Sequence, residues 1–364
     1  MSNYTVYMNP KTQDRGLVTT LFGRPAANRL SKQWRPNSAL VYDFYEIHSV
    51  KVFDRAVRHV NQYPDSVIVI NFSHESMPSS IVRADEYPII QQLIERINPP
   101  QLVVLLCQQD TILSVQKHLP GVGTLYINSW ESLTPVQEPT ETRRTRIGSF
   151  HRRYSAPRAL WMYTMRNYLD RIHYTFGDRG YWDPSVPPSV FQHTQLKTLG
   201  GLNPELKHRV ETWQNQQRPW RQFPGVDSTE WNHDQVLQAT RSVQHCAVIE
   251  SRADAQPRSS GFLTEKTFRP IAAQTAVYPL TEGAGIEQYG YEPYILYHST
   301  SWIERVGELA LHMQQLIAMS EAEYQHHQNT IAEKIHYNTQ HLLRRNTTQY
   351  KRSTAPERLK PYFQ

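Results

Sequence analysis

Residues 66–72 read SVIVINF, and this short stretch decides which class of fold the chain adopts. The stretch is continuous, apolar and rich in β-branched residues, which is typical of a strand buried on both faces of a sheet. Two further strands are predicted at Leu102 to Cys107 (LVVLLC) and Gly123 to Asn128 (GTLYIN), and helices at Tyr87 to Ile97 and at residues 111–118. Strands that alternate with helices predict an α/β fold with a mostly parallel sheet and right-handed crossovers.

The same alternation resumes further along the chain, after an interruption. Residues 131–146 carry Pro, Thr and charged residues without an apolar period, which predicts a linker. Beyond it the pattern predicts, in order, a short strand from Ile147, helices at Ala156 to Leu169 and His233 to Ser242, strands at Cys246 to Glu250 and Ala276 to Leu280, and two helices within Ile303 to Leu343. Residues 1–40 are polar and irregular, and no element is predicted there.

The length of the chain bounds the number of domains. A chain of 364 residues suits about two domains of roughly 150–200 residues each. We predict an N-terminal Rossmann-like domain with its linker at residues 1–146, a C-terminal Rossmann-like domain at residues 147–345 and a basic tail at residues 346–364. In such folds a ligand binds where loops leave the carboxyl ends of the strands, often in the cleft between the halves.

Composition excludes several classes of protein. Hydrophobic residues make up 39% of the chain and aromatic residues 11%, which is enough for packed cores, so a disordered chain is not expected. No run approaches the ~18 apolar residues of a membrane span, and the N-terminus lacks the layout of a signal peptide. We therefore expect a cytoplasmic protein with no membrane partner. Cys107 and Cys246 are expected to be ordinary buried thiols.

The net charge of +6 comes with clusters of arginine. The clustered basic residues are Arg143, Arg144 and Arg146, then Arg152 and Arg153, then Arg344, Arg345, Lys351 and Arg352. Such a cluster is either a solvated surface or a surface that attracts phosphates, of a nucleotide or of a nucleic acid. In the second interpretation Arg143, Arg144 and Arg146 would bind the acceptor of a reaction.

The segment Gly261 to Ala273, GFLTEKTFRPIAA, carries the most chemistry. Thr264 before Glu265 and Lys266 predicts a helix start, where free backbone N–H groups and the helix dipole favour an anion. In this interpretation Lys266 adds a positive charge for a diphosphate, Glu265 accepts hydrogen bonds from ribose hydroxyls, and Arg269 lies one turn beyond. The alternative is a solvated amphipathic helix with an i,i+4 charge pair between Glu265 and Arg269.

This segment resembles the Val-Thr-Glu-Lys stretch of α1,3-fucosyltransferases and, more closely, glycosyltransferase-like proteins common in bacteriophage genomes. Three further segments agree in order. Ser149 to Arg158 (SFHRRYSAPR) is similar to the Asn-Arg-Arg stretch that opens the second half in the phage group, and Cys246 to Glu250 resembles the strand before the donor loop. Glu333 to His341 (EKIHYNTQH) is similar to a closing helix that carries His-Asn. The resemblance covers roughly residues 148–345 and implies a GT-B-like fold, with two Rossmann-like domains and a helical C-terminus.

The resemblance also implies roles by position for the donor site. Glu265 would bind the ribose of a nucleotide-sugar donor and Lys266 its phosphates. Arg153, with Arg152, would neutralise charge on the leaving nucleotide diphosphate, and Glu250 would orient one of these basic groups or touch the sugar. Because the leaving diphosphate gains charge in the transition state, fixed cations stabilise it there. The site then needs no metal and no cofactor besides its co-substrate, a UDP- or GDP-linked sugar.

An inverting transfer needs a base that takes the proton of the acceptor hydroxyl. The strand at residues 66–72 runs directly into Ser-His-Glu-Ser, and Asn-Phe-Ser-His-Glu-Ser is similar to the Asn-Phe-Glu-Ser stretch of fucosyltransferases with two residues inserted. We predict Glu75 as the base, with His74 next. Asp43 and Glu46 are lesser candidates. The alternative for Glu75 and His74 is a loop cap or a surface charge.

The acceptor is left with three interpretations. Arginine clusters with interleaved Trp and Tyr favour DNA, and the phage resemblance implies a hydroxymethylated pyrimidine such as 5-hydroxymethylcytosine, extruded from the base stack. A phage-encoded enzyme of this kind would act in the host cytoplasm. The second interpretation is a glycan or lipopolysaccharide acceptor, as for fucosyltransferases. The third is a non-catalytic nucleic-acid-binding protein that keeps the fold.

Overall fold

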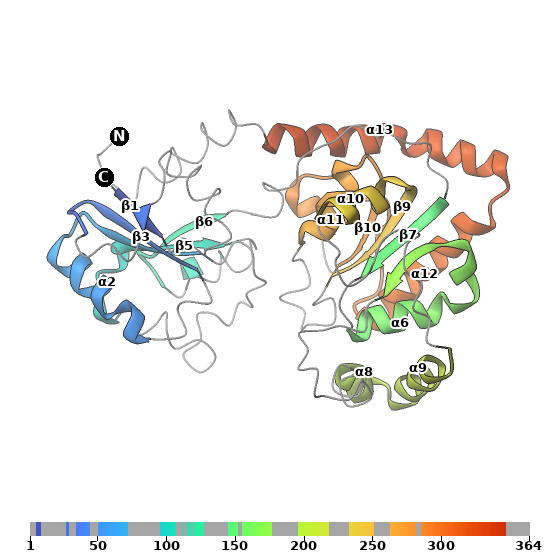
Figure 1. Cartoon of the computed structure of the whole chain (residues 1–364), viewed down its shortest axis with the longest axis horizontal. Helices are drawn as coiled ribbons and strands as arrows, with labels where there is room; N and C mark the ends of the chain where they lie inside the picture. Colours follow the sequence, from blue (N-terminus) through green and yellow to red (C-terminus); the bar gives the residue numbers. More distant parts are fainter. Residues whose placement is uncertain are drawn as a thin grey trace. The chain divides into compact units, whose positions relative to one another are not determined.

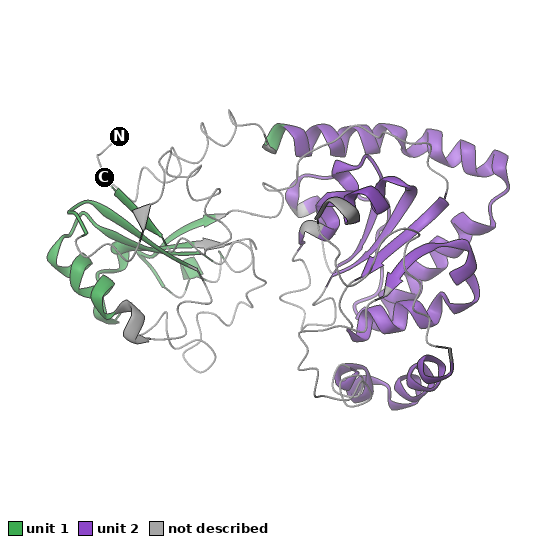
Figure 2. Ribbon diagram, viewed as in Figure 1, with its two compact units in different colours: residues 1–133, 344–364 green, residues 134–343 purple. Residues whose placement is uncertain are grey.

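A computed structural model divides the chain into two compact units (Figure 2). Residues 1–133 with 344–364 form unit 1, and residues 134–343 form unit 2. The structure describes residues 5–8, 27–28, 34–43, 50–71, 95–106, 112, 115–117, 119–126, 145–151, 155–176, 196–217, 233–250, 263–281 and 285–346. Among the described residues, no helix is long and apolar enough to cross a membrane.

Unit 1 contains a parallel sheet of six strands in the order β2-β1-β3-β4-β5-β6 (Figure 1). The elements are β1 (Thr5–Met8), β2 (Ala27–Asn28), β3 (Ser38–Asp43), α2 (Val50–Gln62), β4 (Val67–Asn71), η3 (Pro99–Gln101), β5 (Leu102–Leu106) and β6 (Gly123–Tyr126). All five residues of β4 are buried, as expected for a strand covered on both faces. The strands predicted from SVIVINF, LVVLLC and GTLYIN are confirmed.

The first forty residues contain strands that the sequence analysis missed. β1 lies inside the sheet between β2 and β3, and its Val6, Tyr7 and Met8 are buried. The prediction of an irregular N-terminus is therefore wrong, because four residues, TVYM, are too few to show a period within a polar surrounding. The helix predicted at Tyr87 to Ile97 falls mostly outside the described residues. Of residues 111–118, those described (112 and 115–117) are helical.

Unit 2 contains a parallel sheet of four strands in the order β10-β9-β7-β8. Its strands are β7 (Thr145–His151), β8 (His173–Phe176), β9 (Val243–Ile249) and β10 (Ala276–Leu280). The chain passes from β7 to β8 on one side and then returns to β9 on the other side of β7. The order of the strands thus reverses between β7 and β9, and open parallel sheets bind ligands at the carboxyl ends beside such a reversal.

The helices of unit 2 contact this second sheet or one another (Figure 1). They are α6 (Ala156–Thr164), η4 (Arg166–Arg171), α8 (Lys197–Leu202), α9 (Pro204–Gln217), α10 (His233–Arg241), α11 (Glu265–Ala272), η5 (Gly285–Tyr289), α12 (Trp302–Ala318) and α13 (Glu321–Asn346). Trp161 of α6 and Leu309 of α12 share one buried cluster with Ile147, Ala247 and Tyr278 of the sheet. α10 and α11 contact β9 and β10 outside that cluster.

Most of the predicted elements of unit 2 are confirmed, with differences at their ends. β7 begins at Thr145, so the last two residues of the predicted linker belong to a strand. α6 ends at Thr164 and a 3₁₀ helix follows it, where one helix to Leu169 was predicted. β8, α8 and α9 were not predicted. α9 is polar over most of its length and joins the core through few apolar residues, among them Val210 and Trp213, so its period is weak.

Candidate functional site

The carboxyl edge of the second sheet brings together residues from separate parts of the chain. His151 ends β7, Glu250 directly follows β9, and α11 begins after its N-cap residue Thr264. β7 and β9 are hydrogen-bonded neighbours, and the order of the strands reverses between them. Because a parallel sheet binds ligands at such a reversal, these residues form the candidate site.

Glu250 is buried at the start of α11 and accepts three hydrogen bonds there. Its Oε1 accepts from the backbone N of Thr264 (2.9 Å) and from Thr267 Oγ1 (2.9 Å), and its Oε2 accepts from Thr264 Oγ1 (2.7 Å). A carboxylate is favoured at this place because the helix dipole puts partial positive charge at the N-terminus. Glu250 therefore holds the end of β9 against the first turn of α11.

Thr264 connects this carboxylate to Lys266. The hydroxyl proton of Thr264 goes to Glu250, so Thr264 Oγ1 acts as an acceptor toward the backbone N of Lys266 (3.3 Å) and its Nζ (3.1 Å). The helix start predicted at Thr264 is confirmed, and the threonine side chain is the N-cap. The chain of contacts Glu250–Thr264–Lys266 places the ammonium group of Lys266 at the N-terminus of α11.

Arg158 adds a fully buried cation to this edge of the sheet. It lies on α6, and its Nε donates to the carbonyl oxygen of Ile249, the last residue of β9 (2.9 Å). A buried cation is costly unless hydrogen bonds and anions compensate it. Among the described residues of this edge, the two cations Arg158 and Lys266 accompany one carboxylate, that of Glu250. Positive charge beside the N-terminus of α11 attracts anions.

His151 lies close enough to both cations for their charges to act on it. The side chain is buried, and its Nε2 lies 2.8 Å from Ser149 Oγ, which also donates to the carbonyl oxygen of Ala247 (3.2 Å). Burial, followed by the charges of Arg158 and Lys266, holds the pKa of His151 well below its ordinary value. The imidazole ring is therefore neutral at pH 7.

The structure brings together three of the predicted donor-site residues, Glu250, Thr264 and Lys266, as described above. Arg269 lies on α11, about one turn beyond Lys266. Glu265 is the first residue of α11, and its side chain lies outside the described part of the structure. The other predicted residues lie outside the described residues, and their roles stay predictions: His74, Glu75, Arg143, Arg144, Arg152 and Arg153.

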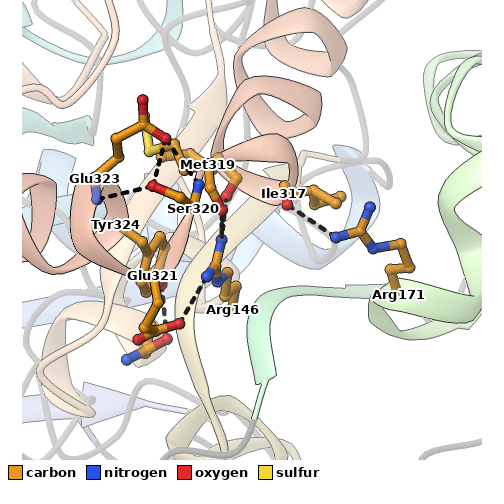
Figure 3. A network of polar contacts seen from close by, with 10 residues as sticks. Arg146, Arg171, Ile317, Met319, Ser320, Glu321, Glu323 and Tyr324 are labelled. Carbon is orange, nitrogen blue, oxygen red and sulfur yellow. Dashed lines mark hydrogen bonds and ion pairs between the residues drawn. The ribbon is translucent and has the colours of Figure 1, made fainter.

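Arg146, predicted to bind an acceptor, contacts the end of α12 (Figure 3). Its Nη1 donates to the carbonyl oxygens of Leu316 (3.1 Å) and Met319 (2.7 Å), and its Nη2 to Glu321 Oε2 (2.9 Å). The guanidinium also lies 4.0 Å from the ring centre of Tyr324. A cation is favoured here because the last carbonyls of a helix lack partners inside the helix. These contacts give Arg146 a structural role, and its acceptor role stays a prediction.

Four residues of the site carried no predicted role: Ser149, His151, Arg158 and Thr267. One signal for the first pair was available, since residues two apart in a strand share a face. The role of Arg158 could not be predicted in this way, because the sequence of an apolar helix does not indicate which strand end its single arginine contacts. Among the described residues, no group of three or more His, Cys, Asp or Glu side chains is placed to hold a metal ion. The prediction of a metal-independent site stays a prediction.

Comparison with known proteins adds evidence on the fold. Neither a protein-family model nor a curated protein matches the chain. Among solved structures, the chain is similar to an α,α-trehalose-phosphate synthase (UDP-forming) from Burkholderia vietnamiensis, with 12% identity and a TM-score of 0.53. The aligned region covers 95% of this chain and 81% of the synthase chain. Likewise, 91% of the chain is similar to a chain of the GtfA/B complex, with 9% identity and a TM-score of 0.52. This chain spans 58% of the length of that GtfA/B chain.

These similarities concern the fold alone, because the sequences are only 9% and 12% identical. They show that the chain has an α/β fold with parallel sheets that matches these neighbours of the GT-B type. The predicted α/β class is thereby confirmed. Shared fold does not carry substrate or activity with it, which depend on the residues of the site.

Proposed function

We propose that the chain is a glycosyltransferase that binds a nucleotide-diphosphate sugar at the carboxyl edge between β7 and β9. One observation carries this proposal, namely the gathering of Lys266, Arg158 and the N-terminus of α11 where the order of the strands reverses. Two cations beside a helix N-terminus suit a diphosphate, because both the backbone dipoles and the side-chain charges attract it. The fold shared with GT-B neighbours supports the proposal.

The proposed chemistry is stabilisation of a leaving group. When the bond between the sugar and the diphosphate breaks, negative charge grows on the diphosphate, and cations already in place stabilise that charge without reorganising. Lys266 would provide one such charge, held by Thr264. Arg158 is buried and hydrogen-bonded to the end of β9. Its positive charge would therefore stabilise the diphosphate at a distance or through a single hydrogen bond. Arg152 and Arg153 would add to this charge, as predicted from the resemblance.

Glu250 is proposed to position the other groups and not to exchange protons. Both of its carboxylate oxygens already accept hydrogen bonds from Thr264 and Thr267, so proton transfer would break contacts that hold α11. A base for an inverting transfer would then come from the first unit. Glu75, followed by His74, stays our candidate, since both follow the buried strand β4 in the sequence.

The donor and the arrangement of domains follow from the same proposal. We propose two Rossmann-like domains, with the donor site in the second and the acceptor site in the first. A UDP-linked sugar is the first donor to test, because the similar trehalose-phosphate synthase is described as UDP-forming. A GDP-linked sugar is the second. Transfer would be inverting and independent of a metal ion.

The test is thermal unfolding of the purified chain in the presence of UDP-, GDP-, CMP- and dTDP-linked sugars. A donor present at about 100 times its dissociation constant should stabilise the native state by about 2.7 kcal/mol. Lys266→Ala should abolish most of this shift, whereas Lys207→Ala should leave it unchanged. Lys207 is a matched control, since it lies on α9 of the same unit and pairs with Glu211 (3.1 Å) outside the site. A well-folded protein that no donor stabilises would contradict the proposal.

For the acceptor we propose a hydroxyl group on a hydroxymethylated pyrimidine in DNA. The support is the arginine-rich sequence near residues 143–153, together with the resemblance to phage proteins. Transfer of radiolabelled sugar to hydroxymethylated DNA should fall steeply between 50 and 200 mM salt, because binding to DNA releases counterions. A glycan acceptor would show little dependence on salt. Binding of DNA without transfer, by a protein that binds no donor, would favour the non-catalytic alternative.

A further inference from the structure

His151 is the one described residue of the site that leaves a buried polar atom without a partner. The side chain is 1% exposed, and within the described part of the chain no hydrogen-bond partner reaches its Nδ1. A buried acceptor without a partner costs about 1–3 kcal/mol, so native proteins supply one from the chain, a water molecule or a ligand. The unpaired nitrogen lies at the edge where Arg158 and Lys266 favour an anionic ligand.

The contacts of Ser149 decide which ring nitrogen carries the proton. Ser149 has one hydroxyl proton, and we assign it to the carbonyl oxygen of Ala247 (3.2 Å), because a carbonyl oxygen can only accept. The Ser149 oxygen then acts as acceptor toward the second polar atom beside it, Nε2 of His151 (2.8 Å). Nε2 therefore carries the proton of the ring. Because burial and the neighbouring cations keep the ring neutral, Nδ1 is left with a bare lone pair.

A bare lone pair restricts the chemistry of its partner. Phosphate oxygens at neutral pH accept hydrogen bonds and do not donate them, so they suit Lys266 and Arg158 and do not suit Nδ1. A hydroxyl group does donate, and a nucleotide sugar carries hydroxyl groups on either side of its diphosphate, on the ribose and on the transferred sugar. A cationic pair next to a neutral acceptor thus matches a ligand in which phosphates and hydroxyl groups are neighbours.

We propose that His151 is a specificity residue whose Nδ1 accepts a hydrogen bond from a hydroxyl group of the bound nucleotide sugar, with Ser149 fixing the tautomer that makes this possible. The proposal rests on the proposed function, since it presupposes a nucleotide sugar at this edge of the sheet. It adds a recognition element for hydroxyl groups to a site otherwise described by its charges. Ser149 is a positioning residue in this scheme, because it acts through His151.

The experiment measures dissociation constants of UDP, 2′-deoxy-UDP and UDP-glucose by calorimetry, or of GDP, 2′-deoxy-GDP and GDP-mannose if the wild-type protein selects guanosine. His151→Phe keeps a planar ring and removes the acceptor, so it should weaken binding of the nucleotide sugar on the order of tenfold. His151→Asn keeps a short side chain with an acceptor and should recover part of this loss. Ser149→Ala should weaken binding in the same direction and to a smaller extent, because the tautomer is no longer fixed.

His312→Phe is the matched control. His312 also has a buried ring nitrogen without a partner among the described residues, and it lies on α12 outside the site. Its substitution should leave all dissociation constants unchanged. A loss at His151 that appears with UDP-glucose alone identifies a hydroxyl group of the transferred sugar. If His151→Phe weakens binding of UDP and of UDP-glucose equally and leaves binding of 2′-deoxy-UDP unchanged, the hydroxyl group is the ribose 2′-hydroxyl.

The outcomes separate this inference from the proposed function. A wild-type protein that binds no nucleotide sugar overturns both. If the wild-type protein binds UDP-glucose and the His151→Phe variant binds every probe with the wild-type dissociation constant, the proposed function stands and the role of His151 is overturned. A His151→Phe variant that only unfolds at lower temperature, with unchanged dissociation constants, overturns it too, because Nδ1 would then bond a structural water molecule.

Discussion

At the scale of single residues, Glu250 shows how a buried charge organises a site without reacting. Its two oxygens accept from Thr264 and Thr267, and Thr264 in turn accepts from Lys266. Because the single hydroxyl proton of Thr264 goes to Glu250, its oxygen can only accept from Lys266. Holding the side chain of Lys266 in place before binding should strengthen the binding of a ligand, because less rotamer entropy is then lost when the ligand binds.

Glu250→Gln tests this organisation. The variant places an amide N–H₂ group where one carboxylate oxygen accepted, beside Thr264 Oγ1, which already receives hydrogen bonds from Lys266. We expect a loss of about 1–3 kcal/mol in the free energy of unfolding, measured by urea denaturation, together with weaker binding of the nucleotide sugar. A variant with wild-type stability and wild-type binding would show that Glu250 does not position Lys266.

At the scale of elements, the sequence predicted those whose pattern is long or extreme. Five buried residues in β4 and the N-cap Thr264 before α11 carry strong local signals. The four residues of β1 and the mostly polar α9 do not, because tertiary contacts decide their state. The candidate site follows the same rule. Thr264 and Lys266 are two residues apart in sequence, whereas His151 and Arg158 join them only through the pairing of β7 with β9.

The end of α12 provides a prediction at this scale. Arg146 donates to two carbonyl oxygens of the α12 C-terminus and to Glu321, whose side chain is 83% exposed. Because exposed ion pairs contribute little, the carbonyl contacts should dominate. We expect Arg146→Ala to lower the free energy of unfolding of unit 2 by about 1–2 kcal/mol, and Glu321→Ala by less than about 0.5 kcal/mol. Equal losses in urea denaturation of the two variants would show that the ion pair carries the stability.

At the scale of the whole molecule, the described histidines whose pKa is lowered are more numerous in one unit than in the other. Burial is the first cause that lowers the pKa of five histidines among the described residues, namely His59, His151, His173, His312 and His327. His59 belongs to unit 1, and the other four belong to unit 2. In the native state each of them resists protonation, whereas in the unfolded chain each binds a proton near pH 6.5.

Stability should therefore decrease as the pH falls below about 6.5, and more in unit 2 than in unit 1. A base whose pKa is lower in the native state stabilises the fold fully above its unfolded pKa, and this contribution is lost as the unfolded chain takes up protons. Each such histidine contributes a slope of up to about 1.4 kcal/mol per pH unit. The pKa values of the Glu308 and Glu323 carboxylates are lowered, so these groups titrate only at more acidic pH. They therefore do not contribute to the loss of stability just below pH 6.5.

Hydrogen exchange at pH 7.5 and at pH 5.5, corrected for the intrinsic exchange rate, measures the two units separately. Peptides from β9 and α12 should lose more protection at pH 5.5 than peptides from β3 and β4. The ring of His327 is stacked on His245 of β9 (5.5 Å), and the ring of His312, on α12, lies 5.1 Å from that of Tyr278 of β10. His327→Phe should reduce the loss in unit 2, since one site of proton uptake in the unfolded chain is removed. Equal losses in both units would mean that these four histidines do not govern the response of unit 2 to acid.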